Sequence, residues 1–445
     1  MNVCLGSILL CLATLLFVLL YIHIFRIEDE TIDTSQSSLF ESIDLSSGPE
    51  DILVNSEILE THPSSETTHH NAATEKLIKI LHSPSKLAQF EFDQCRMADC
   101  FDYSRCSSEG PIRVHIVPKS SEHSLSETGE SNIIHDNIID IVRKSKYHEP
   151  DPNKACIFLL EDDTLDRDPL SKSFKTDLPN LLSAEYQYGM NHLVFNLYSG
   201  SWPDYRTNDF AGFNIGAAIL AKASNSYSNH RPEFDISLPL FSHLHPKDDS
   251  DETPSRNVSS NRPYLLTFKG KRYVHGLDGD TRNSLYHLSN GRDVILLTTC
   301  RHGKKWRDAI DERCSQDDAT YDNYDFADLM MQSKFCLTPR GRRLGSFRYL
   351  EAMSYGCVPV VLSDGWVKPF GEIIDWSKVV IQLDEDMILL VPDILRDISD
   401  YSIKVMQKNI RAIYRQYFST LERIITTTLS IIEKRVKNHN TRVDS

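Results

Sequence analysis

The sequence predicts an α/β protein made of two parallel-sheet domains that face each other across a cleft. Short apolar runs of strand length alternate with stretches of helical spacing in both halves, and a polar, proline-containing segment at 246–262 separates the two sets. A chain of 445 residues is also too long for one simple core. Parallel sheets bind ligands beyond the carboxyl ends of their strands, so ligand-binding residues are expected there.

The expected elements follow the chain in order. In the first half, strands are expected at 112–117, 155–160 and 192–198, with helices at 133–142 and 213–223. In the second half, strands are expected at 264–269, 294–299, 335–338, 358–362 and 379–383, with helices at 281–287, 325–333 and 346–355. One long amphipathic helix at 402–436 is expected to pack across both domains.

The N-terminal part predicts a membrane anchor. Residues 3–25 carry no charge, and a run of this length can cross a bilayer as a helix. The segment lacks the basic start and small-residue cleavage site of a secretory signal, so an uncleaved anchor over 1–27 is expected, with cleavage as the alternative. Arg26 opposes a cytoplasmic N-terminus, whereas the acidic residues 28–30 and the cysteines favour one.

The acidic charge is concentrated outside the predicted domains. The stretch 28–75 contains twelve acidic residues and no lysine or arginine, so it carries most of the net charge of -15. A composition rich in Ser, Thr and Glu predicts a flexible stem over 28–88. The acidity is therefore no argument against an anion site in the domains, which are expected at 89–262 and 263–437, before a tail at 438–445.

The cysteines indicate an oxidising compartment, because eight of them, an even number, follow the anchor. Connectivity does not follow from sequence, and the reduced core cysteines of a cytosolic enzyme are the alternative. No metal site is expected, since no CxxC pair occurs. A glycosylation sequon at Asn257 agrees with a lumenal location. The simplest pairing joins sequence neighbours: Cys95 with Cys100, Cys106 with Cys156, Cys300 with Cys314, and Cys336 with Cys357.

The segment 336–351 has the form of a strand, a basic loop and a helix. Four arginines, Arg342 among them, and no acidic residue lie between 338 and 348. Gly341 and Gly345 allow close backbone approach, and Ser346 is a candidate N-cap that leaves free N–H groups at a helix start. Guanidinium groups in such a place suit phosphate or carboxylate oxygens. The segment therefore predicts an anion site, with a solvated basic loop as the alternative.

The helix of this segment adds a carboxylate to the predicted site. Arg348 and Glu351 are three residues apart and share one helix face, while Phe347, Leu350 and Met353 are expected to face the core. A carboxylate beside an anion site suits hydrogen bonds from sugar hydroxyls better than phosphate binding alone. The alternative is a simple helical ion pair.

A second basic cluster ends the expected strand at 264–269. Lys269, Lys271 and Arg272 precede Tyr273, and Arg282 begins the next helix. At the cleft these cations would bind a diphosphate or a carboxylate. The alternative is a basic turn balanced by the aspartates that follow it.

Acidic and aromatic residues supply further candidates. Five carboxylates in 161–168 follow the strand at 155–160 and would hold a metal or supply a general base, Asp166 or Asp168 being favoured over metal binding. Asp204 lies in an aromatic stretch that suits a sugar ring. Helix capping, salt bridges and packing are the alternatives. Tyr321, Tyr324 and Phe326 would flank a uracil base or belong to the core.

Together these motifs resemble the exostosin family, specifically its glycosyltransferase family 47 domain, over about residues 90–435. The resemblance implies a GT-B fold whose C-terminal domain binds the nucleotide. It implies inverting transfer of glucuronate from UDP-glucuronate to a terminal N-acetylglucosamine of heparan sulfate, without a metal or further cofactor. The runs that carry it are TLDRD at 164–168, HLVFNLYSG at 192–200, WPDY at 202–205, FKGKRY at 268–273, LTTC at 297–300 and PRGRRLGSFR at 339–348.

The resemblance also implies residue roles and partners. It puts Asp166, Asp168 and Asp204 on the acceptor side as candidates for the catalytic base. Typical exostosins continue into a family 64 domain, so a chain ending at Ser445 is expected to pair with a longer exostosin. The expected location is the membrane of the Golgi apparatus or endoplasmic reticulum, as a single-pass type II protein. No nucleic-acid partner is expected. A silent subunit, or an enzyme using another donor such as UDP-galactose, is the alternative. The residues placed around the nucleotide sugar are Lys269, Lys271, Tyr273, Arg282, Tyr321, Phe326, Arg342, Arg348 and Glu351.

Overall fold

The fold is known from a computed structural model, which describes residues 94–107, 109–119, 133–166, 178–198, 213, 215–242, 245–246, 261–274, 280–301, 306–308, 310–341 and 343–443. The expected anchor and stem lie outside these residues, as do Asp168, Asp204, Asn257 and Arg342. Within the described ranges, no helix is both long enough and apolar enough to cross a membrane.

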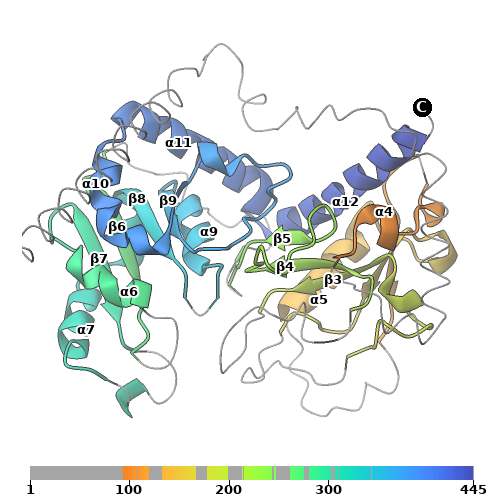
Figure 1. Ribbon diagram of the computed structural model, residues 1–445, viewed down its shortest axis with the longest axis horizontal. Helices are drawn as coiled ribbons and strands as arrows, with labels where there is room; N and C mark the ends of the chain where they lie inside the picture. Colours follow the sequence, from red (N-terminus) through yellow and green to blue (C-terminus); the bar gives the residue numbers. More distant parts are fainter. Residues whose placement is uncertain are drawn as a thin grey trace, which may run out of the picture. The chain divides into compact units, whose positions relative to one another are not determined.

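The first half of the described chain forms a parallel five-stranded sheet (Figure 1). Its strands are adjacent in chain order: β1 (Val114–Val117), β2 (Ile157–Leu160), β3 (His192–Asn196), β4 (Ile219–Ala223) and β5 (Ile236–Leu238). Every residue of β2 to β5 is buried, which explains why these strands are mainly apolar and lack the alternation of a half-exposed strand. The predicted helix at 213–223 is wrong, because its last five residues form the buried strand β4, which pairs with a strand on each side.

The second half forms another parallel five-stranded sheet. Its strands are β6 (Tyr264–Lys271), β7 (Val294–Thr299), β8 (Ser333–Pro339), β9 (Val358–Leu362) and β10 (Ile381–Leu383). Their order is β10-β9-β8-β6-β7, so the strand order reverses between β6 and β8. Open α/β sheets bind ligands at such a switch point, outside the carboxyl ends of the strands. Two parallel sheets of this kind confirm the predicted α/β class and its GT-B organisation.

Short helices connect the strands of the second sheet. The predicted helices at 281–287, 325–333 and 346–355 are confirmed with small shifts in their ends. The one at Cys314–Asp322 was not predicted, because among its residues only Cys314 is buried and no apolar face marks it. The connecting helices are α6 (Asp280–Ser284), α7 (Cys314–Asp322), α8 (Phe326–Met331) and α9 (Phe347–Ser354), and α10 (Val391–Arg396) follows the last strand.

The C-terminal segment contains two long helices instead of the single one predicted. α11 (Asp400–Ile413) runs into a π-helical turn, Tyr414–Phe418, and α12 (Leu421–Val443) follows. The Thr420 hydroxyl accepts from the Arg423 N–H and so caps the new helix start. α11 contacts β9 of the second sheet, and α12 contacts α5 (Ile133–Lys144) of the first half, as Figure 1 also shows. The segment thus packs against both halves, as expected.

All four expected disulfides are present: Cys95–Cys100, Cys106–Cys156, Cys300–Cys314 and Cys336–Cys357. Cys336 lies in β8, and Cys357 directly precedes β9, its neighbour in the sheet. This last disulfide therefore joins the two ends of the segment that contains the basic loop and α9.

Candidate functional site

Two lysines lie at the end of β6, beside the switch point. The buried Lys269 donates a hydrogen bond to the Tyr324 carbonyl, and its ammonium lies 4.2 Å from the centre of the Tyr321 ring. Burial lowers the pKa of Lys269. Lys271 is exposed, and its side chain has no hydrogen bond or ion pair with any described residue. β6 thus supplies one fixed cation and one that is accessible to a ligand.

Arg282 joins the ends of β6 and β8. Its Nη1 donates to the Lys271 carbonyl over 2.8 Å, its Nη2 to the Pro339 carbonyl over 3.2 Å, and its Nε to the Arg340 carbonyl over 2.9 Å. A Cβ atom at Gly341 would lie 3.0 Å from Arg282 Nη2, so the glycine lets the loop approach the guanidinium.

No carboxylate among the described residues neutralises the charge of Arg282. The side chain is buried, and burial lowers its pKa. No described carboxylate forms an ion pair with it, and only carbonyl dipoles accept from it. Three of its five N–H groups are used, so guanidinium donors remain for an anion at the switch point.

The start of α9 positions Arg348 and Glu351. The Ser346 hydroxyl accepts from the Arg348 N–H, which confirms the predicted N-cap. Arg348 Nε donates to the Lys269 carbonyl over 2.8 Å, and its guanidinium pairs with Glu351 and lies 4.6 Å from the centre of the Phe326 ring. The predicted shared face of Arg348 and Glu351 is therefore confirmed as a close ion pair, tied to the end of β6.

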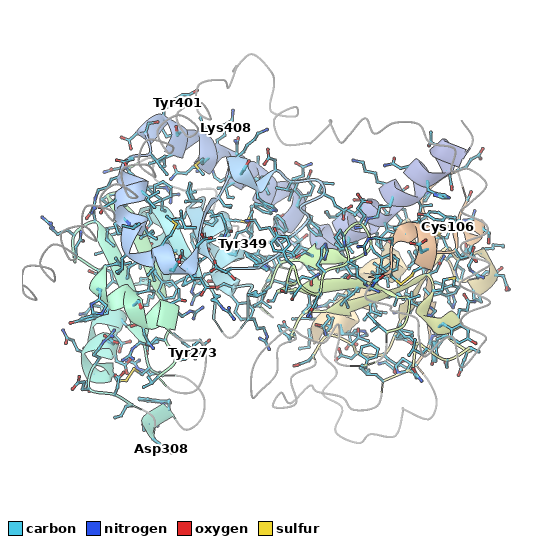
Figure 2. The ribbon with its side chains drawn as sticks, in the orientation of Figure 1. Cys106, Tyr273, Asp308, Tyr349, Tyr401 and Lys408 are labelled. Atoms are coloured by element: carbon cyan, nitrogen blue, oxygen red, sulfur yellow. A yellow bond between two sulfur atoms is a disulfide. The ribbon has the colours of Figure 1, made fainter. Side chains whose placement is uncertain are left out.

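The three predicted aromatic residues contact these cations. Tyr321 packs under Lys269 and Phe326 under Arg348, while the Arg282 guanidinium lies 5.6 Å from the centre of the Tyr273 ring. Figure 2 labels Tyr273 at this end of the second sheet. Cation–π contacts hold the basic groups in place. The residues predicted around a nucleotide sugar are thus brought together, with Lys271 exposed among them and Arg342 outside the described residues.

The first half contributes one of its three candidate carboxylates near the basic loop. Asp166 is buried and forms a β-bridge with Tyr198. Burial raises the pKa of Tyr198 to about 12; Arg343 opposes this shift, and Asp166 and Asp163 add to it. The Arg343 guanidinium lies 5.8 Å from the centre of the Tyr198 ring. Tyr198 therefore connects the acidic run after β2 with the arginine-containing loop after β8.

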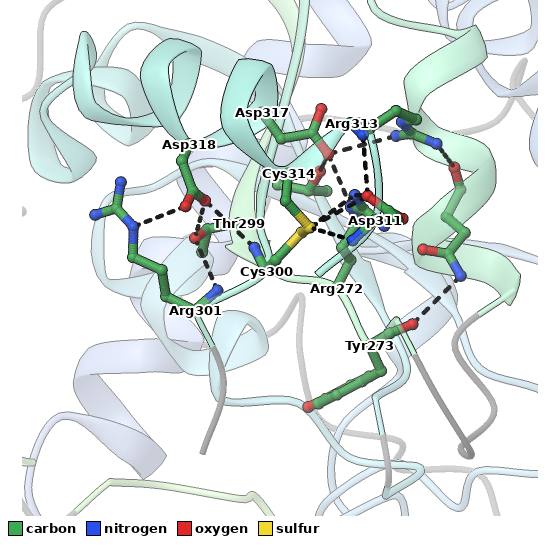
Figure 3. The surroundings of a disulfide bond; sticks show 12 residues. Arg272, Tyr273, Thr299, Cys300, Arg301, Asp311, Arg313, Cys314, Asp317 and Asp318 are labelled. Carbon is green, nitrogen blue, oxygen red and sulfur yellow. Dashed lines mark hydrogen bonds and ion pairs between the residues drawn. A yellow bond between two sulfur atoms is a disulfide. The ribbon is translucent and has the colours of Figure 1, made fainter. Parts of the chain in front are cut away.

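Arg272 does not belong to this site, although the sequence groups it with Lys269 and Lys271. It is buried, donates two hydrogen bonds of 2.6 Å to Asp311, and donates one of 2.8 Å to Asp317 (Figure 3). It also lies beside the Cys300–Cys314 disulfide. Successive side chains of a strand point to opposite faces, and this alternation separates Arg272 from the two lysines.

Solved structures of glycosyltransferases resemble the chain only distantly. The apo form of the lipopolysaccharide outer core galactosyltransferase WaaB is 12% identical, covers 72% of this chain and 99% of its own, and gives a TM-score of 0.35. WaaG, a glycosyltransferase involved in lipopolysaccharide biosynthesis, is 11% identical, covers 72% and 99%, and gives 0.33. Likenesses at these TM-scores carry no weight in the assignment.

Sequence relatives and a protein family match this chain far more closely than those solved structures do. Exostosin-1b of Danio rerio and Exostosin-1 of Drosophila melanogaster are each 46% identical, over 355 and 352 residues. Both matches cover 78% of this chain and 46% of the relative, so the chain spans about half the length of the curated relatives it matches. The family described as the Exostosin GT47 domain matches residues 54–398, more than half of the sequence. The chain therefore belongs to the exostosin GT47 family of glycosyltransferase domains.

Proposed function

We propose that the protein transfers glucuronate from UDP-glucuronate to the terminal N-acetylglucosamine of a growing heparan sulfate chain, with inversion at the sugar carbon. The single observation that carries this proposal is the set of cations at the switch point. Lys271 is exposed, and the buried Arg282 has no carboxylate partner among the described residues. A diphosphate and a sugar carboxylate are the anions that such a group would neutralise.

The same cations suit the chemistry of the transfer. An inverting displacement leaves UDP with a growing negative charge, and fixed positive groups stabilise that charge without a metal. Arg282 and Lys269 are held by backbone carbonyls, so they need little reorganisation. Glu351 stays paired with Arg348 and offers its carboxylate to sugar hydroxyls.

The acceptor is assigned to the first half. The acceptor hydroxyl needs a general base, for which Asp166, Asp168 and Asp204 are the candidates. Asp166 is the one that the described residues connect to the basic loop, through Tyr198 and Arg343. We place the catalytic part in the lumen of the Golgi apparatus or endoplasmic reticulum, anchored by the N-terminal helix, as one subunit of a co-polymerase with a longer exostosin. The disulfides agree with an oxidising compartment.

The test uses the full chain, made in the secretory pathway, alone and together with a longer exostosin. UDP-glucuronate and an oligosaccharide ending in N-acetylglucosamine are supplied, and the product is analysed for a new β1,4-linked glucuronate. UDP binding is measured separately by calorimetry. Neither transfer nor UDP binding in any setting would refute the enzyme and leave a silent subunit.

Donor choice is tested in the same assay. UDP-galactose carries the same diphosphate without the sugar carboxylate, so it separates recognition of the nucleotide from recognition of glucuronate. Transfer from UDP-glucuronate alone supports the proposal. Preference for UDP-galactose would show that the protein is a glycosyltransferase with a different donor.

A further inference from the structure

Ser224, the residue after β4, has two energetically unfavourable features. Its φ angle is +58°, in the left-handed region that side chains rarely adopt. It is also fully buried, and its hydroxyl oxygen has no hydrogen-bond partner among the residues that the structure describes. Strained backbone and unsatisfied polar groups persist where the surrounding structure enforces them, often at functional sites. The neighbours of Ser224 therefore indicate what it does.

The residue that packs against the Ser224 hydroxyl is Gly345, at the end of the basic loop. A Cβ atom built on Gly345 would lie 2.7 Å from Ser224 Oγ, closer than real Cβ contacts. Gly345 directly precedes Ser346, the N-cap of α9. Its other neighbour, Leu344, accepts a hydrogen bond of 2.8 Å from the buried Ser363 hydroxyl. The loop is thus held on both sides just before the helix that carries Arg348 and Glu351.

Ser224 also begins a segment, 224–227, that we call the β4 clasp. The Tyr227 N–H donates to the Gly365 carbonyl and the Val367 N–H to the Asn225 carbonyl, both over 2.9 Å. Ser226 forms an antiparallel bridge with Trp366. The clasp therefore fixes the first half to the segment after β9 by backbone hydrogen bonds, and Ser224 cannot withdraw from Gly345 without breaking this pairing.

We propose that Ser224 is a positioning residue for the donor site. Through its contact with Gly345, the first half sets the place of the basic loop and of the α9 start, and thereby the affinity for UDP. Ser224 is fully buried, so it acts through Gly345 and not by touching the donor. The inference rests on the proposed function, because it assumes that the loop binds a UDP-sugar. Beyond that function, donor affinity depends on Ser224, which directly follows strand β4 of the first sheet.

The test is a double-mutant cycle in the full chain, with UDP affinity and the thermal unfolding midpoint as readouts. Gly345→Ala places a methyl group against Ser224 Oγ and displaces the loop, so UDP affinity should fall by about tenfold or more. Ser224→Gly removes Oγ and relaxes the positive φ; its midpoint should hold or rise, and UDP affinity should fall by about threefold as the loop loosens. The double variant should return to within about threefold of the unaltered chain.

Gly371→Ala is the matched control, because the nearest atom to a Cβ there is the Lys368 carbonyl oxygen at 3.7 Å. It should leave UDP affinity unchanged. The proposal is overturned if Gly345→Ala binds UDP normally, or if Ser224→Gly fails to rescue it. If Gly345→Ala does not fold, Ser224→Gly alone decides, and unchanged UDP affinity refutes the proposal. Absence of UDP binding by the unaltered chain would instead refute the proposed function and, with it, this inference.

Discussion

Arg272 and Arg282 are buried side chains close together in the sequence, yet their surroundings differ in one decisive respect. Arg272 donates to the carboxylates of Asp311 and Asp317, whereas Arg282 donates to three backbone carbonyls. Hydrogen bonds that Arg272 donates to Asp311 raise the pKa of Arg272, and burial lowers the pKa of Arg282. Among the described residues, Arg272 therefore has carboxylate partners and Arg282 has none.

This difference separates a structural cation from a ligand-binding one. A buried charge without a carboxylate is unfavourable for the isolated protein, and an incoming anion relieves it. We therefore expect the Arg272 region to contribute to stability and the Arg282 region to contribute to donor binding. Single substitutions at these residues should therefore separate effects on stability from effects on donor binding.

The largest expected effect is on folding, at Arg272. Arg272→Met removes the buried guanidinium from Asp311 and Asp317, leaving Asp317 only its longer, 3.6 Å pair with Arg313, and should lower the free energy of unfolding by about 3–4 kcal/mol. UDP affinity of the folded protein should be unchanged. Denaturant unfolding and UDP calorimetry measure the two effects. Arg301→Met is the control: Arg301 also pairs with two aspartates, but its side chain is 40% exposed, so the loss of stability should be far smaller than for Arg272→Met.

The next effect is on binding, at Arg282. Arg282→Met removes the buried guanidinium and frees the ends of β6 and β8, so UDP affinity should fall by about 100-fold. The loss of unfolding free energy should be smaller than at Arg272, because no carboxylate is left unpaired. Normal UDP affinity combined with a stability loss as large as that of Arg272→Met would erase the distinction between the two arginines.

Lys271 should show a smaller and more selective effect. Lys271→Ala removes the exposed cation and should lower transfer from UDP-glucuronate by about tenfold, with an unchanged unfolding midpoint. Lys408→Ala is the matched control, an exposed lysine on α11 that Figure 2 shows far from Tyr273. Equal effects of the two variants would show that general surface charge, and not the switch point, attracts the donor.

The smallest effect concerns pH and stability. Arg272 holds the pKa of Asp311 below its ordinary value, so this pair stabilises the fold fully above the unfolded-state pKa of about 4 and loses its contribution as pH falls through the lower folded-state value. The midpoint difference between the unaltered chain and Asp311→Asn should therefore shrink below about pH 4. A difference that grows on acidification would contradict this pairing.

The sequence predicted the second sheet better than the first because its strands are separated by clear turn and helix signals. The strands at 294–299 and 358–362 match their predicted limits. β4 was mistaken for a helix because a strand buried on both faces has no alternation, so its run of Ile, Leu and Ala also fits helical spacing. The division between α11 and α12 depends on packing against two different surfaces, which no local pattern reveals.

The sequence predicted which residues make up the candidate site. It did not predict most of the contacts that these residues make. The sequence identified Lys269, Arg282 and Arg348 as cations near one another. It did not show that Arg272 takes two aspartates from another segment, since such partners are chosen by tertiary contacts. Phe347 was expected in the core and is 37% exposed, because the loop turns the first residue of α9 outward while Leu350 and Met353 are buried. The contribution of Ser224 had no signal in the sequence.

The Cys336–Cys357 disulfide has a consequence for how this protein is made. It closes a covalent ring that contains the basic loop and α9. The segment proposed to bind the donor is therefore restrained even before the sheets assemble. A ring of this size, with a sequence separation of 21, is expected to stabilise the fold by about 3 kcal/mol. Protein produced in a reducing cytosol lacks that restraint. Reduced protein that binds UDP weakly should recover its UDP affinity once its thiols are oxidised.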